Sequence, residues 1–174
     1  PDFAFWDENF SVEEQSLREG YNAVIGYQWS DQHKPEKFKN MLKRFSTEGF
    51  KLPFFATPES HNTPRAASRD GDVTYSRYAW AMSNFIPAIP FLHSGFEIGE
   101  KVPVNTGLDF TKEAMQQFPS EQLPLFSERA YDWLNREEVT GFVHALSAVR
   151  ARYQTVIVNP SRETCLWHES DNPD

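Results

Sequence analysis

Apolar residues follow two different periods along the chain, one typical of buried strands and one typical of amphipathic helices. Short apolar runs predict strands at residues 3–8, 20–27, 52–55 and 89–92. A segment with apolar residues at helical spacing follows each run. Strand then helix, repeated four times, predicts an α/β fold with a parallel sheet and right-handed crossovers.

Capping residues and proline positions predict where the helices begin and end. Ser11 and Glu14 form a capping box for a short first helix that ends at Gly20. Pro35 begins the second helix and Gly49 ends it. The third helix is marked by Tyr75, Tyr78, Ala79, Met82, Phe85 and Ile86 and closed by Pro87; the fourth starts at Asn135 with Glu138. The predicted buried positions are Phe38, Met41, Leu42 and Phe45 in the second helix and Phe142, Val143, Leu146 and Val149 in the fourth.

The third predicted strand runs directly into a group of polar and titratable residues. Pro58 and Pro64 exclude a helix here and hold the residues that follow the strand in loop conformations. His61, Asn62 and Arg65 are therefore presented together at the carboxyl end of a strand. In parallel α/β proteins this end of the strands carries the chemistry, so the sequence predicts a functional site here.

Four segments resemble, in the correct order, strands five to eight of the catalytic barrel of the α-amylase family, family 13 of the glycoside hydrolases. They are residues 3–10, 20–27, 61–65 and 89–100, of which residues 61–65 read His-Asn-Thr-Pro-Arg where the family has His-Asp-Thr-Pro-Arg. The last segment has a Ser-Gly-Phe-Glu form that looks closer to the bacterial maltosyltransferases of this family than to its secreted amylases. The resemblance implies the C-terminal half of a TIM (β/α)8 barrel, with strands five to eight and their helices.

The resemblance also implies an activity and the residues that carry it. The family's retaining enzymes hydrolyse or transfer α-1,4-linked maltooligosaccharides, and Glu8 stands where they have the general acid. The structural alternative for Glu8 is a solvated side chain or an acceptor for a helix amide. His61 and Arg65 are candidate substrate-binding residues: His61 matches a sugar-binding residue, and Arg65 is either an ion-pair partner that orients a carboxylate or a surface charge.

Aromatic residues make up 15% of the chain, and sugars present flat C–H faces that pack on aromatic rings. Trp6 and Trp29 are candidate substrate-binding residues because they lie in or near the segments that end at the predicted site. Trp133 lies in a similar position in a later segment. The structural alternative for each tryptophan is the core.

Asn62 departs from the family pattern, which has an Asp that stabilises the transition state at this position. An amide keeps the shape and loses the charge, which is a loss of a few kcal/mol in such sites. The change either inactivates the site, or Glu59 supplies the carboxylate instead, or the domain binds glucan without cleaving it. The residues alone leave these three explanations open.

The family's nucleophile, an Asp in a Gly-x-Arg-x-Asp setting, has no counterpart in the sequence. A complete barrel typically needs about 250 residues, and this chain has 174. We therefore expect residues 1–158 to form half of a catalytic barrel, with a long loop excursion at residues 101–135. Residues 159–174 form a polar tail or begin a further domain. The expected partner is the N-terminal half of the barrel, without which the chain is inactive. The second hypothesis is a catalytically silent carbohydrate-binding or interaction domain.

Charge and composition narrow the setting further. A net charge of −8 disfavours nucleic acid and anionic membrane surfaces as partners. No apolar run approaches the roughly 20 residues of a membrane span, and a cytoplasmic location is expected. The single Cys165 forms no internal disulfide, and the five histidines do not cluster at ligand spacing, so neither a metal nor another cofactor is predicted.

Overall fold

The structure is a computed structural model and describes residues 3–8, 13–25, 34–49, 51–107, 116–119, 121–126, 128–134, 138–159, 161–164 and 166–171. Its strands are β1 (Trp6–Asp7), β2 (Ala23–Val24), β3 (Phe55–Ala56) and β4 (Ile89–Pro90). Its helices are α1 (Glu13–Glu19), α2 (Pro35–Glu48), α3 (Asp72–Asn84), α5 (Glu138–Arg152) and α6 (Gln154–Ile157), with short 3-10 turns η2 (Ala66–Ser68) and η3 (Phe96–Ile98). Ser11, Trp29, Asn135 and Cys165 lie outside the described residues.

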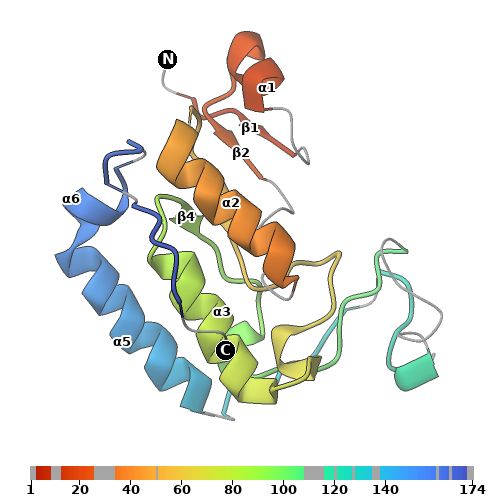
Figure 1. Cartoon of the computed structure of the whole chain (residues 1–174). Coiled ribbons are helices and arrows are strands. Elements are labelled where there is room, and N and C mark those ends of the chain that lie inside the picture. Colours follow the sequence, from red (N-terminus) through yellow and green to blue (C-terminus); the bar gives the residue numbers. More distant parts are fainter. Residues whose placement is uncertain are drawn as a thin grey trace.

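The predicted alternation of strands and helices is confirmed within the described residues (Figure 1). Helix α2 begins at Pro35 and is followed by Gly49, as its sequence predicts, and Gly20 follows α1 with a φ of +87°. Helix α3 begins at Asp72, three residues before the first apolar position that marked it in the sequence.

The strands run parallel and pair in chain order. β1 pairs with β2, with Trp6 opposite Ala23, and β3 pairs with β4, with Phe55 opposite Ile89. A single parallel bridge between Val24 and Phe54 joins the two pairs. The strands are only two residues long, and a closed barrel is not visible in the described residues. Because all four run in one direction, their carboxyl ends meet at one edge.

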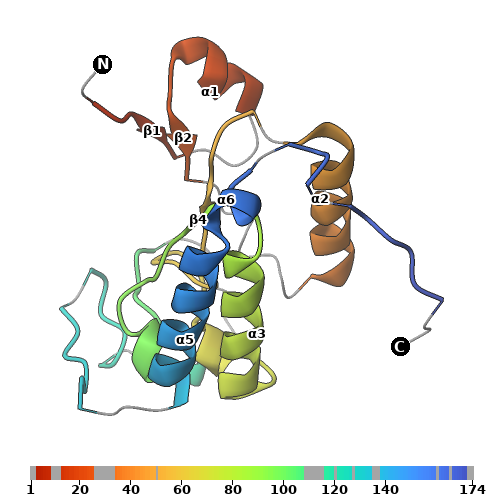
Figure 2. The same ribbon diagram turned by 90° about the vertical axis from the view of Figure 1, so that its left-hand side faces the viewer.

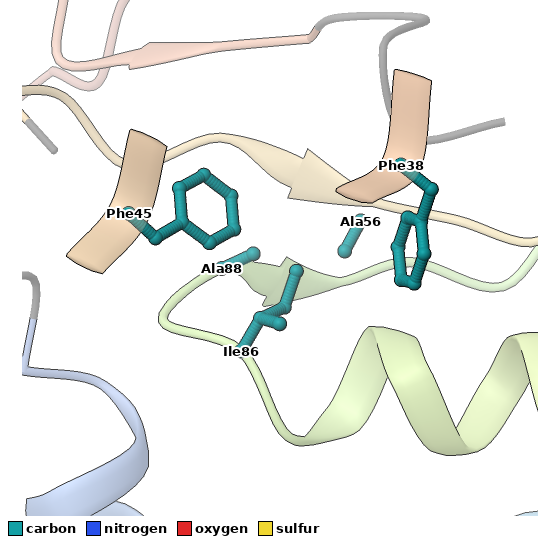
Figure 3. Packing of buried hydrophobic residues seen from close by; sticks show 5 residues of the cluster. All are labelled: Phe38, Phe45, Ala56, Ile86 and Ala88. Carbon is teal, nitrogen blue, oxygen red and sulfur yellow. The ribbon is translucent and has the colours of Figure 1, made fainter. Parts of the chain in front are cut away.

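Helix α2 covers one face of β3 and β4. Phe38 and Phe45 point from α2 onto Ala56, Ile86 and Ala88, and all five side chains are buried (Figure 3). Aromatic and aliphatic side chains here exclude water from the sheet, which is the main stabilising term for such a layer. This face is the principal core of the strand layer.

The opposite face of the strands, which we call the open face, consists of Trp6, Phe55, Ile89 and Phe91. Phe55 packs between two aromatic rings, with ring centroids 4.9 Å from Trp6 and 5.9 Å from Phe91. Trp6, Ile89 and Phe91 nevertheless remain exposed. Parallel sheets are normally covered on both faces, whereas among the described residues the open face remains apolar surface without such cover.

Helices α3 and α5 lie side by side and share a second core with η3 (Figure 2). Phe142, Val143 and Leu146 pack against it, as predicted. The prediction that Val149 is buried is wrong, because 38% of its surface is exposed. The next residue, Arg150, turns inward at this point and leaves Val149 on the outer side of the helix.

Arg150 ties α5 to the connection between α3 and β4. Its guanidinium donates hydrogen bonds to the carbonyl oxygens of Asn84, Ile86 and Ala88. Burial lowers the pKa of Arg150 from its ordinary value, since desolvation disfavours the charged form. Several backbone acceptors compensate for that cost, and they fix the start of β4 against the last helix.

The C-terminal segment returns to α2, where Lys43 forms a salt bridge of 2.7 Å with Glu169. The Lys43 ammonium also lies 5.2 Å from the centre of the Trp167 ring. Lys43 therefore helps to hold the described part of the tail against α2.

Candidate functional site

The predicted site residues lie at the carboxyl ends of two strands. Glu8 follows β1 directly and is exposed. Residues 57–65 follow β3 and are largely buried. Since β1 and β3 belong to one parallel series, both groups lie at the same edge of the strands. The structure therefore brings Glu8 and residues 57–65 to one edge, where Glu8 is exposed and most of the others are buried.

Glu59 and Arg65 form a buried ion pair at the end of β3. The Arg65 Nη1 atom donates to Glu59 Oε1 across 2.6 Å, and both side chains are almost completely buried. The second carboxylate oxygen, Oε2, accepts the backbone N–H of Ala66 at 2.6 Å, where η2 begins. Of the two alternatives for Arg65, the ion-pair partner is confirmed and the surface charge is wrong.

Arg65 also reaches three neighbouring segments. Nη1 donates to the Ser94 carbonyl at 2.9 Å, Nε to the Val102 carbonyl at 3.2 Å and Nη2 to the Tyr131 hydroxyl at 2.9 Å. Nη1 also lies 2.7 Å from Nδ1 of His93. Because a guanidinium has donors and no acceptor, a hydrogen bond between these two atoms has Arg65 as its donor.

This hydrogen-bonded set, which we call the Arg65 cluster, joins the end of β3, the turn after β4 and both ends of the long loop excursion. Removing two charges from water costs several kcal/mol per ion, and a buried pair compensates only if further hydrogen bonds satisfy it. Here Arg65 has donors engaged on every nitrogen and both Glu59 oxygens accept bonds. The arrangement fixes the loops relative to one another.

Asn62 is buried beside the Arg65 cluster. Its side-chain oxygen Oδ1 accepts a hydrogen bond of 2.7 Å from the Thr106 hydroxyl, and its backbone N–H donates to Ser60 Oγ at 3.2 Å. Thr106 belongs to the loop excursion, so that excursion contacts the end of β3 at a second point. His61, in contrast, is exposed next to it.

The remaining predicted residues have simpler surroundings. Trp6 is 54% exposed and packs its ring against Phe55, so it belongs partly to the open face. Trp29 lies outside the described residues. After β4, Glu97 accepts the backbone N–H of Gly95 and Glu100 accepts that of Val102.

Sequence reasoning gave no role to His93, Thr106 or Tyr131, all of which contact the predicted residues. His93 lies in the fourth strand segment, and its position after an apolar run was a usable signal. Thr106 and Tyr131 are 44 and 66 residues away from their partners. Nothing in the local pattern indicates contacts over such separations.

Within the described part of the chain, no group of His, Cys, Asp and Glu is arranged to hold a metal ion. None of the described helices is long and apolar enough to cross a membrane. A hollow of about 390 Å³ lies between α5 and the amino-terminal starts of β3 and β4, lined in part by Leu52, Pro87 and Arg150. It is at the other end of the strands from Asn62 and the Arg65 cluster.

No protein-family model matches this chain, and no curated protein matches its sequence. The resemblance to the α-amylase family therefore rests on the four segments themselves and on how they are arranged.

Proposed function

We propose that the chain is the C-terminal half of an α-amylase-family catalytic barrel and supplies the general acid, Glu8. The complete enzyme is a retaining glycosidase or transglycosylase that acts on α-1,4-linked maltooligosaccharides. The observation that carries the proposal is the shared edge, where the ends of β1 and β3 present the family-like residues together. Parallel strands in chain order are the arrangement that a barrel half requires.

The open face gives independent support. In a (β/α)8 barrel the helices lie outside and large apolar side chains fill the inside. Here α2 covers one face, and the open face carries Trp6, Phe55, Ile89 and Phe91. The proposed partner, the N-terminal half of the barrel, covers this face and supplies the nucleophile.

The chemistry follows from two carboxyl groups about 5–5.5 Å apart on either side of the glycosidic bond. Glu8 protonates the leaving oxygen while the partner's carboxylate attacks the sugar carbon and forms a glycosyl–enzyme intermediate. Glu8 then removes a proton from water or from an acceptor hydroxyl. An exposed position suits Glu8 for this role, since it must reach a substrate oxygen.

Glu59 is assigned a positioning role in this proposal. Both of its carboxylate oxygens are engaged, and it has no surface through which to approach a sugar. Asn62 then occupies the position of the family's transition-state carboxylate without the charge. A cytoplasmic location belongs to the same proposal, because a reducing compartment suits a sequence with a single cysteine.

The decisive substitution is Glu8→Gln in the catalytically complete protein. Turnover of maltooligosaccharides falls by at least about 100-fold, while substrates whose leaving groups need no proton are largely spared. Glu36→Gln, at an exposed glutamate in the first turn of α2, serves as the control and leaves both rates unchanged. An equal loss on activated and unactivated substrates would contradict the role of Glu8.

A catalytically silent glucan-binding domain is the second candidate, and the neutral Asn62 beside an inaccessible Glu59 favours it. Asn62→Asp distinguishes the two candidates. In the enzyme, the added charge stabilises the developing positive charge and raises turnover with little change in oligosaccharide affinity. In a binding domain, neither the wild type nor the variant turns over the oligosaccharide.

A further inference from the structure

The end of the loop excursion presents an exposed aromatic side chain that packs on a neighbouring ring. Trp133 is 52% exposed, and its ring contacts the Tyr131 ring edge to face, with centroids 5.3 Å apart. The backbone between them is closed by two hydrogen bonds, from Trp133 N–H to the Tyr131 carbonyl and from Leu134 N–H to Asp132 Oδ1. The indole is therefore held by its own turn and by its neighbour.

Tyr131 in turn is anchored to the Arg65 cluster. Its hydroxyl accepts the hydrogen bond from Arg65 Nη2, and its ring lies against Gly95. A Cβ atom at Gly95 would come within 3.1 Å of the Tyr131 ring, and Gly95 has a φ of +96° that side chains rarely adopt. The turn after β4 thus has a glycine where the tyrosine ring needs the space.

Single exposed aromatic residues are common and need no explanation. Trp133 differs because its neighbour Tyr131 is hydrogen-bonded to the buried Glu59–Arg65 pair. The Tyr131 ring limits the side-chain freedom of Trp133, so less conformational entropy is lost when a ligand packs on the indole. A fixed aromatic surface of this kind binds more tightly than a mobile one of the same area. It also lies on the excursion that contacts Asn62 through Thr106.

The charge of the chain limits what such a ring can bind. A net charge of −8 disfavours stacked nucleotides, whose phosphates need nearby cations. A neutral pyranose has a flat C–H face that packs on an aromatic ring and hydroxyls that need polar neighbours. Glu100 lies against Gly95 beside Tyr131 and is paired with Arg129 at 3.8 Å, which places polar groups next to the aromatic pair.

We propose that Trp133 is the stacking surface of a sugar subsite that binds one glucose ring of an α-glucan, with Tyr131 as its positioning residue. The choice of α-glucan rests on the proposed function. The subsite adds a binding residue from the excursion, outside the four segments that carry the resemblance.

The test measures binding of maltoheptaose to the folded 174-residue chain by titration calorimetry. Trp133→Ala weakens the affinity by about 10-fold, the value of one aromatic contact. Trp133→Phe keeps a ring and stays within about 3-fold of the wild type. Phe126→Ala removes another exposed ring of the same excursion and leaves the affinity unchanged. Circular dichroism establishes that each variant is folded.

Three results would overturn the subsite: no binding by the folded wild type, no loss in Trp133→Ala, or an equal loss in Phe126→Ala. A failure of the proposed function gives a different result from a failure of the subsite. If maltoheptaose affinity depends on Trp133 while Glu8→Gln spares turnover in the complete protein, the subsite stands and the general acid does not. If Glu8→Gln abolishes turnover and Trp133→Ala leaves affinity intact, only the subsite is wrong.

Discussion

The carboxyl ends of β1 and β3 carry the two glutamates of interest in opposite settings. Glu59, after β3, has no exposed surface and has a guanidinium and a backbone amide on its two oxygens. Glu8, after β1, is exposed at the same edge. A buried carboxylate whose two oxygens both accept hydrogen bonds serves to hold structure, whereas an exposed one is accessible to a substrate.

The contrast also explains why the β3 end is so densely connected. A buried charge is tolerated only with a partner and with hydrogen bonds for its remaining atoms. Arg65 therefore needs the Ser94, Val102 and Tyr131 acceptors, and these come from three different segments. The loops around Asn62 are therefore held together by the hydrogen bonds that the buried Arg65 guanidinium requires.

Substitution by Gln at Glu59 and at Glu8 should give the largest difference in the free energy of unfolding. Glu59→Gln leaves Arg65 buried without its counter-charge and lowers the free energy of unfolding by about 3–5 kcal/mol. Glu8→Gln changes it by less than about 0.5 kcal/mol, as is usual for an exposed residue. Urea unfolding of both variants, followed by circular dichroism, measures the difference.

A paired substitution controls for the loss of charge. Glu59→Leu combined with Arg65→Met removes both ions and replaces them with apolar groups of similar size. Its stability should exceed that of Glu59→Gln, because no uncompensated charge remains. If Glu59→Gln and Glu8→Gln cost the same, the contrast between the two strand ends does not exist.

Local patterns predicted the order of the strands and helices, for a physical reason, although the strands are shorter than their apolar runs. Pro35 and Gly49 fix the ends of α2 whatever the helix packs against, and apolar runs mark the strands. Val149 was misassigned because burial depends on what a helix packs against, and here Arg150 turns inward instead. The helical spacing of apolar residues cannot show that Arg150, rather than Val149, faces the backbone carbonyl groups before β4.

The site was predicted in part. The positions of Asn62 and Arg65 at a strand end followed from the apolar strand and the prolines around them, and the Glu59–Arg65 pair lies within seven residues of sequence. Tyr131 and Thr106 were not predicted, since their contacts depend on how the excursion folds back. The assignment of Glu8 as general acid stays a prediction.

Tyr131→Phe tests how far the Arg65 cluster depends on the Tyr131 hydroxyl. Its effect on the free energy of unfolding should be intermediate. The ring and its contact with Trp133 remain, but Arg65 Nη2 loses the hydroxyl acceptor. A buried donor left without a partner costs about 1–3 kcal/mol. Tyr153→Phe, at a half-exposed tyrosine next to α6, is the matched control and should be neutral. Equal unfolding midpoints in urea for both variants would separate Tyr131 from the cluster.

The salt bridge between Lys43 and Glu169 extends the comparison of buried and exposed carboxylates to the protein surface. Its removal should have the smallest effect on stability. The hydrogen bond from Lys43 holds the pKa of Glu169 below its ordinary value of 4.5. A carboxylate whose pKa is lower in the folded state stabilises that state above pH 4.5 and loses this contribution as the pH falls through its folded value.

The thermal unfolding midpoint of the wild type should therefore slightly exceed that of Glu169→Gln at pH 7. The two midpoints should converge as the pH falls from 4.5 through the lower pKa that Glu169 has in the folded state, below which its carboxyl group is neutral in both states. High salt at pH 7 should reduce the difference as well, because salt screens an exposed pair much more strongly than a buried pair such as Glu59–Arg65. A difference that persists at pH 2 and in high salt would show that Glu169 holds the tail through contacts other than its charge.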